Sequence, residues 1–229
     1  MIIEFSIPDV LAPTNPFLGY WGAQLVVGHF SDSTKVITLS STFVRCVFSA
    51  REDYLAAAQH LRAAFQASRA VHLSEIYRSI ARFESCITGV YLAVRAFVRF
   101  RRCVELPPEA RAVINSCKPV FATKAVKDRL KVMRDTMQHI EERLVTGELT
   151  DDLPYMIQPT GAEVALNDPT QPGQTVRTID RLRIAEHEVR FSELVEWLDE
   201  MIVYVEKLRS LMPTRWTSSL ADLPKGPAS

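Results

Sequence analysis

Apolar residues that recur at helical spacing constrain the fold of this chain most strongly. Between Val126 and Gly147, apolar side chains alternate at intervals of three and four residues; they are Leu130, Met133, Met137, Ile140 and Leu144. This spacing places them on one stripe of an α-helix, and Gly147 marks the end of that helix. The stretch therefore predicts a long amphipathic helix that packs against other helices.

The same periodicity predicts further helices elsewhere in the chain. One begins near Ala50 and continues to about Gln66, and Pro107 and Pro108 separate the next long helix from a short one. The expected ranges are 75–102 with Ser74 as N-cap, 109–116, and 193–211 with Ser192 as N-cap. Four main helices of this length favour a mainly α fold, arranged as an antiparallel bundle.

Two regions predict β structure. Residues 1–48 contain runs of β-branched and aromatic residues, at 2–7, 24–30, 36–40 and 42–48, separated by proline and glycine. They predict a β-rich N-terminal cap, although the last run also fits the start of a helix. Before the last helix, Glu163–Asn167 and Thr175–Ile184 favour a β-hairpin across a segment rich in turn residues.

These elements suggest three parts. Residues 1–48 form the cap, residues 49–212 form the helical bundle with the hairpin inserted at about 150–190, and residues 213–229 form a flexible tail. The longest apolar patch is too short to cross a bilayer and contains Arg95. The N-terminus has no basic segment before an apolar run, so we expect no signal peptide and no membrane.

The chemistry-bearing residues exclude several functional classes. The four cysteines form no Cys-x-x-Cys pair, and the chain has neither a His-x-x-x-His pair nor a glycine-rich phosphate loop. No cofactor or metal is therefore predicted, and free cysteines fit a cytoplasmic protein. Residues 1–130 carry 16 basic and 10 acidic side chains. This excess either attracts a polyanion or neutralises the acidic second half within one fold.

A row of polar residues lies outside the apolar stripe of the 126–147 helix. Lys131, Asp135, His139 and Arg143 are spaced four residues apart, so they share one side of the helix. Opposite charges at this spacing stabilise a helix surface without any further function. The functional interpretation is acid–base chemistry: His139 transfers a proton, Asp135 orients its ring, and Arg134 holds a phosphate.

The segment Arg134-Asp135-Thr136-Met137-Gln138-His139 resembles the Arg-x(4–6)-His motif of the HEPN (higher eukaryotes and prokaryotes nucleotide-binding) superfamily. Members of that family are helical bundles, and many are metal-independent endoribonucleases of toxin–antitoxin, defence or RNA-processing systems. The resemblance implies catalytic or phosphate-binding work for Arg134, a supporting role for Asp135 and acid–base work for His139. It also implies a homodimer with a composite site, RNA as the partner, and a cognate antitoxin.

Two alternatives stay open. The chain fits a non-enzymatic helical module that binds another protein, with the polar row as ordinary surface charge. It also fits a bundle that binds a small molecule in a deep apolar pocket. A second Arg-x-His spacing, from Arg181 to His187, falls in and just after the predicted hairpin. We favour the first motif because it lies on a long amphipathic helix.

Overall fold

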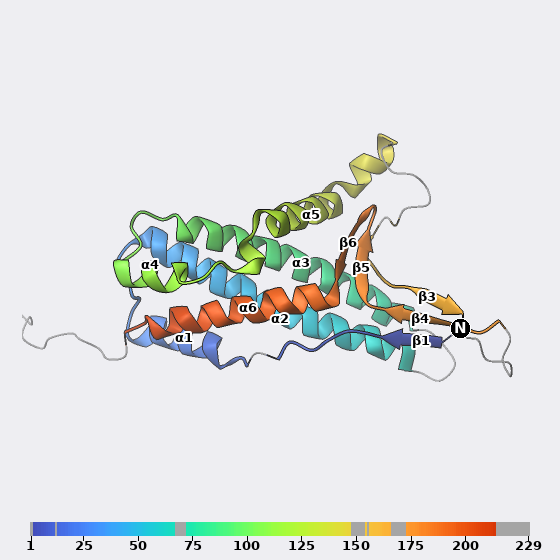
Figure 1. Ribbon diagram of the computed structural model, residues 1–229, viewed down its shortest axis with the longest axis horizontal. Helices are drawn as coiled ribbons and strands as arrows, with labels where there is room; N and C mark the ends of the chain where they lie inside the picture. The colour runs from blue at the N-terminus through green and yellow to red at the C-terminus, as the bar shows by residue number, and fades with distance from the viewer. Residues whose placement is uncertain are drawn as a thin grey trace, which may run out of the picture.

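A computed structural model describes residues 2–11, 13–66, 72–147, 154, 156–165 and 173–213. The helices in this part are α1 (Asn15–Val26), α2 (Thr34–Gln66), α3 (Leu73–Arg101), α4 (Pro108–Asn115), the 3-10 turn η1 (Val120–Ala122), α5 (Lys124–Val145) and α6 (Phe191–Ser210). Long helices α2, α3 and α6 lie side by side, with α5 along α3 and the strands at one end (Figure 1). The predicted mainly α fold is confirmed.

The core of the bundle is aromatic and apolar. Phe97 of α3 is fully buried, and its ring centroid lies 5.2 Å from Phe43 of α2, 4.9 Å from Phe121 of η1 and 4.8 Å from Tyr204 of α6. Edge-to-face aromatic contacts of this kind add to the free energy gained by burial. Three elements, α2, η1 and α6, therefore converge on one side chain of α3.

The α2–α3 pair is the largest helix contact of the described chain, and it depends on one close approach. A Cβ on Gly89 of α3 would lie 3.0 Å from the Cβ of Ala50 and 3.4 Å from the carbonyl oxygen of Cys46, both on α2. Small residues at this crossing allow the two backbones to approach, so the long helices bury their facing sides along most of their length.

The strands form two small sheets. One has the order β1 (Ile2–Phe5), β4 (Thr175–Ile179), β3 (Glu163–Ala165), and the other has the order β2 (Gln158–Thr160), β5 (Arg181–Ile184), β6 (His187–Arg190). β1 pairs with β4 in parallel, whereas the other pairs are antiparallel. The N-terminal strand thus pairs with a segment that comes shortly before the last helix. A small N-terminal β segment and a hairpin before the last helix are confirmed.

The extent of β structure in residues 1–48 was predicted wrongly. Among the described residues of this region, only Ile2–Phe5 forms a strand, whereas α1 occupies 15–26 and α2 already begins at Thr34, not near Ala50. Val36, Ser40, Val44 and Val47 are buried because they continue the apolar stripe of α2 at intervals of four and three. The three valines are β-branched and favour strands, but burial within the bundle outweighs that propensity.

Smaller differences concern helix starts and the hairpin. The N-caps are His72 and Arg190 rather than Ser74 and Ser192, because both serines lie inside their helices. β3 and β4 pair as predicted, but 175–184 is divided between the two sheets at Asp180. Residues 166–172 of the hairpin and 214–229 of the tail lie outside the described residues. No described helix has the length and apolarity of a membrane span.

Candidate nucleic-acid interface

Helix α5 carries the residues predicted to be functional, and its first half is firmly docked. Leu130 and Met133 are fully buried in the contact with α3. On the other side, the guanidinium of Arg129 lies 2.7 Å from a carboxylate oxygen of Glu193 and 4.9 Å from the ring centroid of Trp197, both on α6. The helix is therefore held between α3 and the start of α6.

Arg134 and Asp135 are neighbours that bind each other. An Nη1 of Arg134 donates to Oδ1 of Asp135 at 2.8 Å, and the guanidinium lies 5.6 Å from the ring centroid of Tyr91 on α3. The Nε of Arg134 is buried without a hydrogen-bond partner. Arg134 is thus positioned on the α3 side of α5 and retains an unused donor. Asp135 was predicted to orient His139, but its carboxylate binds Arg134.

His139 lies at a break in α5. Its backbone angles, φ −116° and ψ 18°, are not helical, and its side chain is 57% exposed. Nδ1 of the ring lies 3.1 Å from Oε2 of Glu142. A carboxylate at this nitrogen favours the tautomer with a proton on Nδ1, which leaves Nε2 as an exposed proton acceptor. Glu142 therefore has the orienting role that was predicted for Asp135.

The four polar residues of the predicted row on α5, Lys131, Asp135, His139 and Arg143, do not form a chain of mutual contacts. Arg143 donates to Thr136 at 3.2 Å and to Glu186, next to β6, at 3.4 Å, while His139 contacts Glu142. Arg134 and His139, five residues apart, point about 140° away from each other on a helix. One copy of the chain therefore presents the arginine and the histidine on different sides of α5.

Basic side chains line the open side of the contact between α3 and α5. Arg95, Arg99 and Arg102 of α3 are exposed at intervals of four and three residues, on the flank of α3 that is next to Tyr91. Lys127 and Lys131 of α5 lie within about 60° of Arg134 around the helix axis. α3 and α5 run antiparallel along each other (Figure 1), and helical spacing places both rows on the flanks next to the contact between Tyr91 and Arg134. We use the name basic groove for the six residues of the two rows, which are Arg95, Arg99, Arg102, Lys127, Lys131 and Arg134.

The basic groove has few acidic partners. In the part of the chain that the structure describes, no ion pair engages Arg95, Arg99 or Arg102. Asp128 lies near the lysines, and its pKa is lowered chiefly by a hydrogen bond from Lys124, with added attraction from Lys127 and Lys131. The C-terminal row of α3 also complements the helix dipole. Its alignment with α5 became visible only when the partner helix was placed.

A depression lies where α2, α3 and α5 meet. This depression, about 590 Å³ in volume, is lined by Arg45 of α2, Leu92 of α3 and Gln138 of α5 among others. Glu84 lies at its far end, where burial raises the pKa of its carboxyl group although the N–H of Ile157 donates to it.

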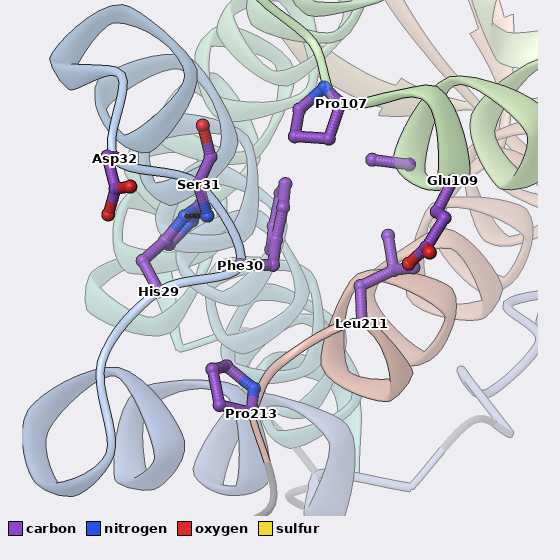
Figure 2. A pocket seen from close by; sticks show the side chains of 9 residues that line it. His29, Phe30, Ser31, Asp32, Pro107, Glu109, Leu211 and Pro213 are labelled. Carbon is purple, nitrogen blue, oxygen red and sulfur yellow. Dashed lines mark hydrogen bonds between the residues drawn. The ribbon is translucent and has the colours of Figure 1, made fainter. Parts of the chain in front are cut away.

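A second hollow, about 320 Å³ in volume, is formed by residues 29–32, Pro107 and the end of α6 (Figure 2). His29 borders it, but both ring nitrogens are occupied: Nδ1 accepts from the N–H of Ser31, and Nε2 lies 3.1 Å from Tyr20 Oη and 3.0 Å from Ser40 Oγ. Burial lowers the pKa of this imidazole. It is a neutral structural histidine that ties α1 to α2.

Sequence reasoning also missed an accessible thiol. Cys46, Cys86 and Cys103 are buried, but Cys117 is exposed, with Sγ 2.9 Å from Tyr204 Oη and 3.4 Å from Lys207 Nζ. The hydrogen bond with the Tyr204 hydroxyl lowers the pKa of the thiol, and Lys207 adds to the effect. Thiolates of lowered pKa react readily. Its polar neighbours in the sequence, Ser116 and Lys118, were the available signal.

Metal chemistry has no recognisable site within the described ranges, where no three histidine, cysteine, aspartate or glutamate side chains group as ligands.

Comparisons with known proteins leave the interface as the principal guide to function: no family model, no curated protein sequence and no solved structure matches this chain.

Proposed function

We propose that this protein binds RNA along the basic groove and cleaves it as a HEPN-like, metal-independent homodimer. The main support for this proposal is the alignment of Arg95, Arg99 and Arg102 with the flank of α5 that contains Arg134. Two converging rows of cations favour a phosphate backbone, which has a regular series of negative charges. Arg134, at the Tyr91 end of these rows and partly exposed, adds a guanidinium that can make a directional contact with a phosphate.

Cleavage requires a second copy, because Arg134 and His139 diverge on one chain. The last turns of α5 project from the bundle (Figure 1) and carry exposed apolar side chains, Leu144 at 39% and Val145 at 89%. Such a surface fits a twofold contact between two α5 helices. That contact would bring His139 of one subunit near Arg134 of the other and the two histidines near each other.

Two histidines complete a balanced reaction. A neutral His139 takes the proton of the 2′-hydroxyl through Nε2, and the freed oxygen attacks the adjacent phosphorus. The 5′-oxygen leaves with a proton from the second, protonated His139. The products are a 2′,3′-cyclic phosphate and a 5′-hydroxyl end. Arg134 stabilises the negative charge that develops on the phosphate oxygens.

Binding is tested with labelled single-stranded RNA and the double variant Arg95→Met/Arg99→Met. We expect about a tenfold weaker affinity and a salt dependence that is shallower by about 0.7 for each phosphate that the variant no longer neutralises. The matched control is Arg78→Met/Arg82→Met, on the same helix, where both arginines are already paired with Glu75 and Asp53. Equal weakening by both double variants would contradict a specific groove.

Cleavage is tested in EDTA by following the cyclic phosphate product. His139→Ala and Arg134→Met should each remove activity while their circular dichroism spectra match the wild type. Mixing wild type with an excess of His139→Ala should lower activity below that of the wild type alone, because a mixed dimer retains only one of the two histidines that the reaction requires. Unchanged activity in this mixture would contradict the composite site but would leave RNA binding intact.

The second candidate is a non-enzymatic protein-interaction module, favoured by the exposed apolar end of α5. In that case α5 docks on another protein, and the ion pairs of Arg134 and His139 serve only the helix surface. Two variants distinguish the module from the ribonuclease. A protein-interaction module still binds its partner in Arg95→Met/Arg99→Met but no longer binds it in Leu144→Asp. It also leaves RNA uncut.

A further inference from the structure

A third hollow lies at the opposite end of α3, between the first turns of that helix and both sheets. Its volume is about 470 Å³, within the range of small-molecule sites. Most of its wall is apolar, with Leu61 and Phe65 from α2, Ile76 and Ile80 from α3, and Ile3 and Ile179 from the β1–β4 pair. Tyr77, at its edge, is 59% exposed, so the hollow opens to solvent.

Among the residues that the structure describes, Arg177 is the one charged side chain that lines this apolar hollow. In β4 it shares a face with Ile179, and it stands beside Ile3 of β1 in the register of the sheet. The alternation of the strands places an arginine where neighbouring positions are apolar. Burying a charged group in such surroundings costs free energy unless a partner compensates it.

The hydrogen bonds of Arg177 are incomplete. An Nη2 donates to Oγ1 of Thr160 on β2 at 3.1 Å, but the buried Nε has no acceptor. Glu163 is the register partner of Arg177 across the β3–β4 pair, yet no ion pair joins them in the described part of the chain. The guanidinium edge therefore lacks the planar, two-oxygen acceptor that it matches best.

We propose that this hollow binds an amphipathic monocarboxylate. Its two carboxylate oxygens accept from Nε and an Nη of Arg177, and its hydrocarbon part packs against Phe65, Ile76 and Ile80. A carboxylate satisfies the orphaned donor and neutralises the charge, while the apolar wall desolvates the chain. A phosphate group fits less well, because the single arginine supplies one positive charge for a dianion. The site is separate from the basic groove and does not depend on RNA binding.

The probe is decanoate, titrated by calorimetry below its micelle-forming concentration and compared with decanol. We expect decanoate to bind the wild type with one site and to bind Arg177→Met about tenfold or more weakly, since charge-assisted hydrogen bonds disappear. Decanol should bind both proteins equally. Arg78→Met, a nearby exposed arginine that does not line the hollow, is the matched control and should leave decanoate binding unchanged.

A second variant separates the pocket from a general surface effect. Ile76→Trp fills the hollow without altering Arg177 and should weaken decanoate and decanol alike. The proposal is overturned if decanoate does not bind the wild type, or if Arg177→Met and Ile76→Trp both bind it with wild-type affinity. Equal weakening by Arg177→Met and Arg78→Met would show attraction to surface charge and would overturn it as well.

Discussion

Helix α3 contacts two helices, α2 and α5, in physically different ways. Against α2 it buries Phe83, Ile87 and Phe97 in a continuous core, along the largest contact of the described chain. Against α5 the fully buried side chains are confined to the first half, and Arg129 adds an ion pair to α6. The first contact specifies the fold. The second holds a helix whose last turn carries the exposed side chains of Leu144 and Val145.

The largest expected effect comes from the α2–α3 core. Phe97→Ala removes a ring that contacts Phe43, Phe121 and Tyr204, and we expect the free energy of unfolding to fall by about 3 to 5 kcal/mol. Val145→Ala, on the exposed end of α5, should change it by less than about 0.5 kcal/mol. Urea denaturation measures both values. Similar changes in the free energy of unfolding for the two variants would contradict the distinction between the α2–α3 core and the exposed end of α5.

A smaller effect is expected where α5 is attached. Arg129→Met removes the ion pair with Glu193 and the cation–π contact with Trp197. We expect the free energy of unfolding to fall by only about 1 kcal/mol, because the side chains of Arg129 and Glu193 are each about one third exposed. Hydrogen exchange should accelerate in α5 while α3 keeps its protection. The distinction between the two contacts fails if α3 loses protection to the same degree.

The sequence predicted the helices where one strong stripe decided the outcome. The stripe from Val126 to Leu144 placed α5 correctly, although Leu144 is 39% exposed because α3 no longer faces it there. The helical region at 34–48 was missed because valine and threonine favour strands as isolated residues. The burial of Val36, Val44 and Val47 depends on α3, which is distant in the sequence.

The candidate site was predictable only in part. The motif residues Arg134 and His139 could be named, and Glu142, three residues after His139, was available from helical spacing alone. The basic groove was not predictable, because its two rows belong to different helices and their convergence depends on tertiary packing. Arg177 was equally hidden, since its unpaired Nε is a property of the packed sheet.

The smallest effect expected is a difference in acid sensitivity at the α5 attachment. Burial alone would raise the pKa of Glu193, but hydrogen bonds from Arg129 and from the N–H of Arg190 outweigh it and lower the pKa. The unfolded chain therefore takes up this proton at a higher pH than the folded chain does. The stabilisation is complete above the unfolded-state pKa and is lost as the pH falls through the folded-state value.

Hydrogen exchange in α5 measures this loss between neutral pH and about pH 3, below the ordinary glutamate pKa. After correction for the intrinsic pH dependence of exchange, α5 of the wild type should lose more protection than α5 of Arg129→Met. Other carboxylates titrate in both proteins and cancel in the comparison. Identical pH profiles would show that the apolar contact with α3 alone holds α5, and that Arg129 adds nothing to the attachment.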